Sequence, residues 1–147
     1  MLLPYHEIIF EAPYVRITWH DEAHTISVID GLAPWTWAQA EEAIGALLKA
    51  QQRVTHPVYT ILRYLNNSSV LPKGSGILSS LRTIMYYDVP HERLVILIGQ
   101  NIVLSRFILM TSNIYGMSKI FSKYRFVTSL EAAFSLIERD KASSLND

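Results

Sequence analysis

Cysteine is absent from this chain of 147 residues, which excludes disulfide bonds, cysteine–metal sites and thiol chemistry. An excess of charge of either sign is also missing, because 13 Lys and Arg residues balance 13 Asp and Glu residues. A nucleic-acid-binding protein usually carries a basic excess or stripe, so no nucleic-acid partner is predicted. Hydrophobic residues make up 50% of the chain and charged residues 18%, which excludes global disorder and is enough for the core of one ordinary domain.

Long uninterrupted hydrophobic runs are missing as well. The first ten residues lack a basic leading segment and are broken by Pro4, His6 and Glu7, which is not typical of a signal peptide. The most apolar stretch, Leu94–Met117, contains polar residues throughout: Gln100, Asn101, Arg106, Ser112 and Asn113. A spanning helix needs about 20 mostly apolar residues, so we expect no transmembrane segment and a cytoplasmic location.

The patterns that are present begin with strands. Residues 14–19 and 25–30 alternate apolar and polar side chains and are joined by a short polar piece, which predicts an antiparallel hairpin. Pro13 is expected to separate this hairpin from a short extended piece at 7–11. Two apolar, β-rich runs at 58–65 and 94–98 predict buried strands, and 124–127 predicts a short last strand.

Helical spacing of apolar residues predicts four helices, at 36–52, 77–89, 101–120 and from 128 onward. The first is expected to open with a capping box of Thr36 and Gln39, and the last with a box of Thr128 and Glu131. Residues 140–147 are expected to form a polar tail. The order β-β-α-β-α-β-α-β-α over 1–147 predicts a single α/β domain with a mixed, mostly parallel five-stranded sheet.

Motifs for catalysis are missing. His20-Asp21-Glu22-Ala23-His24 spells a helicase motif, but the chain has no phosphate-binding G-x-x-x-x-G-K-[ST] loop, and the glutamate is displaced from the His-Glu-x-x-His zinc pattern. We interpret this segment as a solvated turn and predict no metal. His6, His56 and His91 have no nucleophile near them in sequence, and there is no G-x-S-x-G elbow. We therefore predict no catalytic residue, no cofactor and no enzymatic activity.

Two segments are candidates for binding. Lys73-Gly74-Ser75-Gly76 precedes a predicted helix, where backbone amides attract anions, so Ser75 with Gly74 and Gly76 is a candidate anion or phosphorylation site; a plain strand-to-helix connection is the alternative. In the predicted helix 101–120, apolar residues occupy nearly the whole circumference. Burial within the chain, a homodimer surface or a small apolar or lipid-like ligand would each explain this surplus. The interface or ligand candidates are Phe107, Met110, Ile114, Tyr115 and Met117.

The opening hairpin into Gly31, the strands at 58–65 and 94–99, and the ending Tyr124-Arg125-Phe126-Val127-Thr128-Ser129-Leu130-Glu131-Ala132-Ala133 carry a family resemblance. Together they resemble the STAS-like fold of bacterial anti-sigma-factor antagonists and their SpoIIAA-like relatives, a fold also similar to that of certain lipid-binding domains. In the signalling members a phosphoacceptor serine follows an acidic residue at a helix start. Here the matching positions are Lys73 and Gly74, with Ser75 one residue later, and this departure weakens the expectation of a phosphorylation switch.

The resemblance implies a non-enzymatic, regulatory protein-interaction module that contacts partners through its sheet edge and helix faces. The partner would be another protein or, in a homodimer, a second copy of the chain. The alternative function is a carrier or sensor of a small apolar molecule or lipid, held beside residues 101–120.

Overall fold

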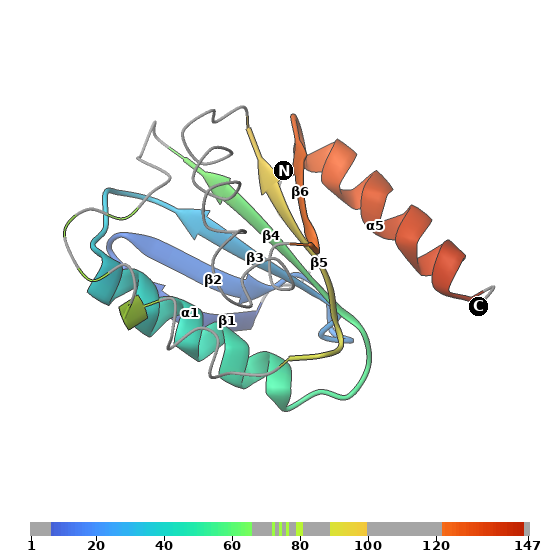
Figure 1. The fold of residues 1–147 in the computed structure, drawn as a ribbon, viewed down its shortest axis with the longest axis horizontal. Helices are drawn as coiled ribbons and strands as arrows, with labels where there is room; N and C mark the ends of the chain where they lie inside the picture. The colour runs from blue at the N-terminus through green and yellow to red at the C-terminus, as the bar shows by residue number, and fades with distance from the viewer. Residues whose placement is uncertain are drawn as a thin grey trace.

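One open sheet forms the centre of the protein (Figure 1). The computed structural model describes residues 7–65, 72, 74, 76, 79–80, 89–99 and 122–145. Its six strands lie side by side in chain order: β1 Glu7–Ala12, β2 Val15–Trp19, β3 Ile26–Gly31, β4 Val58–Tyr64, β5 Glu92–Ile98 and β6 Tyr124–Val127. The predicted α/β class with a mixed sheet is confirmed, whereas the predicted number of five strands is wrong.

The additional strand is β1, which pairs antiparallel with β2. Pro13 does not isolate this segment; Ala12 and Val15 face each other, so Pro13 and Tyr14 form the tight turn between the strands. Proline favours such a turn because its ring presets the backbone angle φ that the first turn position needs. The predicted hairpin of β2 and β3 is confirmed by a continuous antiparallel register from Val15–Gly31 to Trp19–Ser27.

The remaining pairs, β3–β4, β4–β5 and β5–β6, are parallel. Parallel strands need crossover connections, and α1 (Trp37–Gln52) provides the one between β3 and β4. Of the predicted helix at 77–89, the structure describes Ser79 and Ser80, which are helical, and residue 89. The predicted helix at 101–120 lies outside the described residues.

Helix α1 begins as its sequence predicts. The Thr36 hydroxyl accepts a hydrogen bond from Gln39 N at 3.2 Å, and Gln39 Oε1 accepts one from Thr36 N at 2.9 Å. The buried face of the helix packs on β2 and β3 through a cluster that contains Val15, Ile17, Ile29, Trp35, Ala40, Ala43 and Leu47. Burial of this stripe, rather than helix propensity, is what stabilises a helix of this length.

Helix α5 (Leu130–Ser144) departs from two predictions. Its N-cap is Ser129, whose hydroxyl accepts a hydrogen bond from Ala132 N at 3.0 Å, so the predicted capping box of Thr128 and Glu131 is wrong. The predicted polar tail at 140–147 is also wrong, because the helix continues to Ser144. Contacts of Asp140 with the sheet, described below, give a physical reason for this extension.

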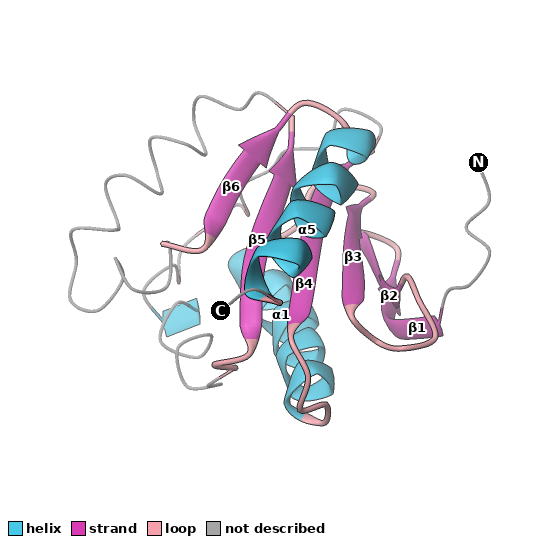
Figure 2. Ribbon diagram, turned by 90° about the vertical axis from the view of Figure 1, so that its right-hand side faces the viewer, coloured by secondary structure: helices cyan, strands magenta, loops and turns pink. Residues whose placement is uncertain are grey.

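The two helices cover opposite faces of the sheet; in Figure 2, α5 lies in front of β4 and β5 and α1 lies behind them. Alternate strand residues divide accordingly: Tyr59 and Ile61 pack under α5, and Val58 packs toward α1. Strand β5 is buried on both faces from Leu94 to Leu97, as its nearly continuous apolar sequence predicts. Within the described residues, no helix is both long and apolar enough to cross a membrane.

Candidate functional site

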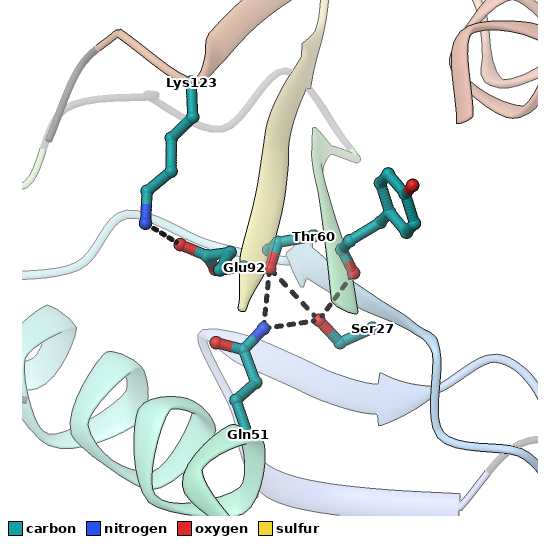
Figure 3. A network of polar contacts seen from close by, with 6 residues as sticks. Ser27, Gln51, Thr60, Glu92 and Lys123 are labelled. Atoms are coloured by element: carbon teal, nitrogen blue, oxygen red, sulfur yellow. Dashed lines mark hydrogen bonds and ion pairs between the residues drawn. The ribbon is translucent and has the colours of Figure 1, made fainter. Parts of the chain in front are cut away.

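A buried polar cluster lies between α1 and the amino ends of the parallel strands (Figure 3). Gln51 Nε2 donates hydrogen bonds to Thr60 Oγ1 at 2.8 Å and to Ser27 Oγ at 3.4 Å. Thr60 Oγ1 donates to Glu92 Oε2 at 2.9 Å, and Lys123 Nζ lies 2.7 Å from Glu92 Oε1. We call these five residues the core network; they join α1 to β3, β4, β5 and the segment that leads into β6.

The core network connects α1 to four parts of the sheet through its hydrogen bonds and one ion pair. Both oxygens of Glu92 are engaged, one by a hydroxyl and one by an ammonium group, so this carboxylate is held as an ion-pair acceptor. The Ser27 hydroxyl lies 3.4 Å from both Tyr59 O and Thr60 Oγ1 and can donate its one proton to either; neither acceptor is a general base. Gln51 Oε1 is buried and has no hydrogen-bond partner in the described part of the chain.

A second cluster lies on the other face of the sheet, around Asp140 of α5. Tyr59 Oη donates to Asp140 Oδ2 at 2.6 Å, while the Arg93 guanidinium contacts both carboxylate oxygens, at 3.0 and 3.2 Å. We call these three residues the Asp140 cluster. It joins the last turns of α5 to β4 and β5, which explains why the helix does not end before Asp140.

Electrostatics within the Asp140 cluster favour the charged carboxylate. Burial raises the pKa of Asp140, but the hydrogen bonds from Arg93 and Tyr59 and the charges of Arg93 and Arg125 outweigh burial and leave the pKa below its ordinary value. For Tyr59, burial and the neighbouring Asp140 raise the pKa to about 12, although Arg93 acts in the opposite direction. Both groups therefore keep one protonation state across the neutral pH range.

Beside the Asp140 cluster is a shallow hollow of about 250 Å³, lined by Leu94, Arg125, Leu136, Arg139 and Asp140. We call it the α5–β6 hollow, because α5 crosses over β4 and β5 and leaves β6 beside it (Figure 2). Leu94 and Leu136 contribute apolar surface, and two guanidinium groups contribute positive charge. Arg125 Nη1 is held by the carbonyl oxygens of Ser122 at 2.8 Å and Tyr124 at 2.9 Å.

A larger hollow of about 550 Å³ runs along α1 next to β1 and is lined by Phe10, Ala38, Glu41, Glu42, Gly45, Ala46 and Lys49. We call it the α1–β1 hollow. It borders the edge of the sheet, since β1 pairs on one side with β2 and no other described strand pairs with it. On β1 the Ile8 side chain is 54% exposed, so it offers apolar surface at this edge.

The His20–His24 segment forms the turn between β2 and β3, as predicted. Asp21 Oδ1 accepts hydrogen bonds from Thr25 N at 2.9 Å and Ile26 N at 3.0 Å, and its other oxygen accepts one from the Thr25 hydroxyl. The His20 ring lies 4.9 Å from the Phe134 ring, whereas the His24 ring stacks on Trp19 at 4.8 Å. Because these two aromatic partners pack on different faces of the sheet, the two imidazole groups do not converge as zinc ligands do.

The other predicted site residues fall largely in undescribed parts of the chain. Ser75 lies outside the described residues, while its neighbours Gly74 and Gly76 have positive φ angles of 91° and 103°. The interface or ligand candidates Phe107, Met110, Ile114, Tyr115 and Met117 also lie outside them.

Among the histidines, His6 is not described. His56 Nε2 lies 2.9 Å from His24 O, and His91 Nε2 lies 2.7 Å from Gln51 O, so both contact backbone carbonyl oxygens.

Sequence reasoning missed Asp140, which it assigned to the tail, and with it the Asp140 cluster. Tyr59 and Asp140 are 81 positions apart in the chain, so local patterns do not connect them. One signal was available: Asp140 follows the buried Ile137 by three positions and therefore lies on nearly the same helical face.

Three comparisons with known proteins, against family models, curated proteins and solved structures, each found no match to the chain. The geometry of the described residues is therefore the basis for assigning a function.

Proposed function

We propose that this protein is a non-enzymatic, regulatory protein-interaction module of the STAS-like type, which binds an extended segment of a partner along the outer edge of β1. The observation that carries this proposal is that no other described strand pairs with the outer edge of β1, which lies beside the α1–β1 hollow. An edge strand presents unpaired backbone N–H and C=O groups, and an added strand gains affinity from these groups and specificity from pockets for alternate side chains.

The composition of β1 supports this use of the edge. Proteins often protect an edge strand with lysine or proline, and neither occurs between Glu7 and Ala12. One irregularity in register lies between Ile8 and Phe10, and its effect is local, since pairing with β2 continues on both sides. Phe10 lines the α1–β1 hollow, so side chains of an added strand on that face would meet the surface of α1.

The polar clusters support a binding role rather than catalysis. Glu92 and Asp140 each have both carboxylate oxygens occupied by hydrogen-bond or ion-pair partners. A general base must lie within hydrogen-bond reach of a substrate proton, whereas the described polar partners of these carboxylates are groups of the protein itself. These carboxylates stabilise the junctions between helices and sheet instead.

The test is selection of random displayed peptides on the purified protein, followed by NMR mapping of the selected peptides. We expect apolar, β-branched peptides that shift the backbone amide resonances of residues 7–12 and slow their exchange. Replacing Ile8→Lys adds a charge at a half-exposed position and should abolish binding. Leu145→Lys is the matched control, since Leu145 is 85% exposed at the end of α5, and it should leave binding unchanged.

Sedimentation at micromolar concentration shows whether the partner is a second copy. A dimer that Ile8→Lys converts to the 16.8 kDa monomer would identify β1 pairing between copies. Peptides that map away from β1, or the absence of both peptide binding and β1-dependent association, would contradict the proposal.

A further inference from the structure

We propose that the α5–β6 hollow binds a carboxylate of a protein partner, carried by an Asp or Glu side chain next to an apolar side chain. The hollow lies at the opposite end of the sheet from β1 and on the other face from α1. This inference therefore does not depend on the interaction proposed for the β1 edge.

The first step in the argument is the balance of charge. Among the described residues that line the hollow, Asp140 is the one acidic side chain, and both of its oxygens accept hydrogen bonds from Arg93 or Tyr59. Within the described part of the chain, the Arg139 side chain forms no hydrogen bond or ion pair. The charge of Arg125 acts on Asp140 from a distance, but neither Arg125 nor Arg139 forms an ion pair with a described carboxylate. Asp140 is already paired with Arg93, so the hollow carries an excess of positive charge among its described side chains.

The second step is the orientation of the donors. Nη1 of Arg125 donates to two backbone carbonyl oxygens, which directs the guanidinium group and leaves its Nε and Nη2 without a described partner. A guanidinium presents its N–H groups in a planar fork that matches the two oxygens of a carboxylate. With one guanidinium held by the backbone, less conformational entropy is lost when an anion binds.

The third step is the shape and chemistry of the walls. Leu94 and Leu136 place apolar surface next to the guanidinium groups, so the complementary ligand combines a negative charge with an apolar group. At about 250 Å³ the hollow is smaller than pockets for drug-sized ligands, which span about 300–1,000 Å³. Its size and openness suit one or two side chains of a partner, and arginine is enriched at the energetic centres of protein interfaces.

The experiment is an NMR titration of the 147-residue chain with acetyl-Leu-Glu-amide, and with acetyl-Leu-Gln-amide and inorganic phosphate as comparison probes. We expect the Leu-Glu probe to shift the amide resonances of Leu94 and Leu136 and the Nε–H resonances of Arg125 and Arg139 in a saturable way. The expected Kd is about 1 mM, as suits a small fragment of an interface, and the Leu-Gln probe should bind about tenfold more weakly.

The variants Arg139→Gln and Arg125→Gln should each weaken binding of the Leu-Glu probe by about tenfold. Arg53→Gln is the matched control, because Arg53 is an exposed arginine at the end of α1 and should have no effect. Equal binding of the Leu-Glu and Leu-Gln probes, no saturable shift, or unchanged binding by Arg139→Gln would overturn the proposal. Phosphate binding as tightly as the Leu-Glu probe would also overturn it, since the apolar wall would then contribute nothing.

Discussion

At Gly31, the last residue of β3, a side chain is excluded by the close approach of Tyr64 and not by an unusual backbone angle. It lies opposite Tyr64 in the parallel register, and a Cβ atom at Gly31 would lie 2.5 Å from Tyr64 Cδ1 and 2.7 Å from Cε1. The Tyr64 ring in turn packs edge-on against the buried Trp35, with ring centroids 6.5 Å apart. A methyl group at Gly31 would therefore push the ring into a packed core.

For this reason we expect Gly31→Ala to lower the free energy of unfolding by about 1–3 kcal/mol, the usual cost of overpacking. Urea denaturation measures this change. In a Tyr64→Ala background the obstructing ring is absent, so the same substitution should cost much less. An equal cost in both backgrounds would show that contact with Tyr64 is not the cause.

Among the secondary-structure elements, the two helices show how far cap chemistry can be predicted. Thr36 and Gln39 form the expected box at α1, because both side chains meet the backbone groups that the spacing predicts. At α5 the sequence offers two adjacent cap formers, Thr128 and Ser129, and the spacing to Glu131 favoured the wrong one. The structure selects Ser129, whose extended backbone, with φ −150° and ψ 161°, points its hydroxyl at Ala132 N.

This assignment makes a matched pair of substitutions informative. Ser129→Ala should destabilise the protein by about 1 kcal/mol, the typical value for loss of an N-cap. Thr128→Ala should change stability by less than about 0.5 kcal/mol, as is usual for an exposed residue outside a cap. Chemical denaturation of both variants measures the two changes in the free energy of unfolding. A larger loss for Thr128→Ala than for Ser129→Ala would show that Thr128 is the N-cap, as the sequence suggested.

For the protein as a unit, several shifted ionisations couple folding to pH. Burial raises the pKa of Asp21, but hydrogen bonds from the Thr25 hydroxyl and from the amides of Thr25 and Ile26 outweigh burial, so the pKa is below its ordinary value. For Asp140, the hydrogen bonds from Arg93 and Tyr59 outweigh burial in the same direction. Burial raises the pKa of Tyr59 to about 12 and raises that of the half-buried Tyr64 and Tyr124 as well. Folding therefore favours charged carboxylates at low pH and neutral tyrosines at high pH.

The expected stability profile is a plateau with two flanks. The contribution of Asp21 and Asp140 is fully present above their ordinary pKa of 3.8 and is lost as pH falls through their lower folded values. The contribution of Tyr59 is present below its ordinary pKa of 10.0 and is lost as pH rises toward about 12. Urea midpoints measured across pH test both flanks.

Two variants assign the flanks to these residues. Asp140→Asn should lower stability at neutral pH and make the acid flank shallower, because one carboxylate no longer takes up a proton on unfolding. Tyr59→Phe should make the alkaline flank shallower, because one tyrosine no longer releases a proton on unfolding at high pH. Flanks that keep their slopes in both variants would place the pH dependence elsewhere.

The amino-acid sequence determined the local features of this protein: the α/β class, the hairpin of β2 and β3, the apolar strands β4 and β5, and the cap of α1. Each depends on side chains within one or two turns or strand steps of one another, so periodicity and cap chemistry are enough to predict it. The same reasoning predicted the turn at His20–His24, because Asp21 bonds to residues four and five positions later.

Contacts between distant residues were decided by tertiary structure. Three such arrangements join separate elements. Strand β1 pairs with β2, Tyr59 and Arg93 donate hydrogen bonds to Asp140, and Arg125 and Arg139 line the same hollow. Their energies arise from burial and charge that exist only after the sheet has assembled, and no local pattern encodes which of many polar residues will meet. Both surfaces proposed here for binding belong to this second group, because a strand edge without a described neighbour and two arginines that line one hollow are properties of the assembled chain.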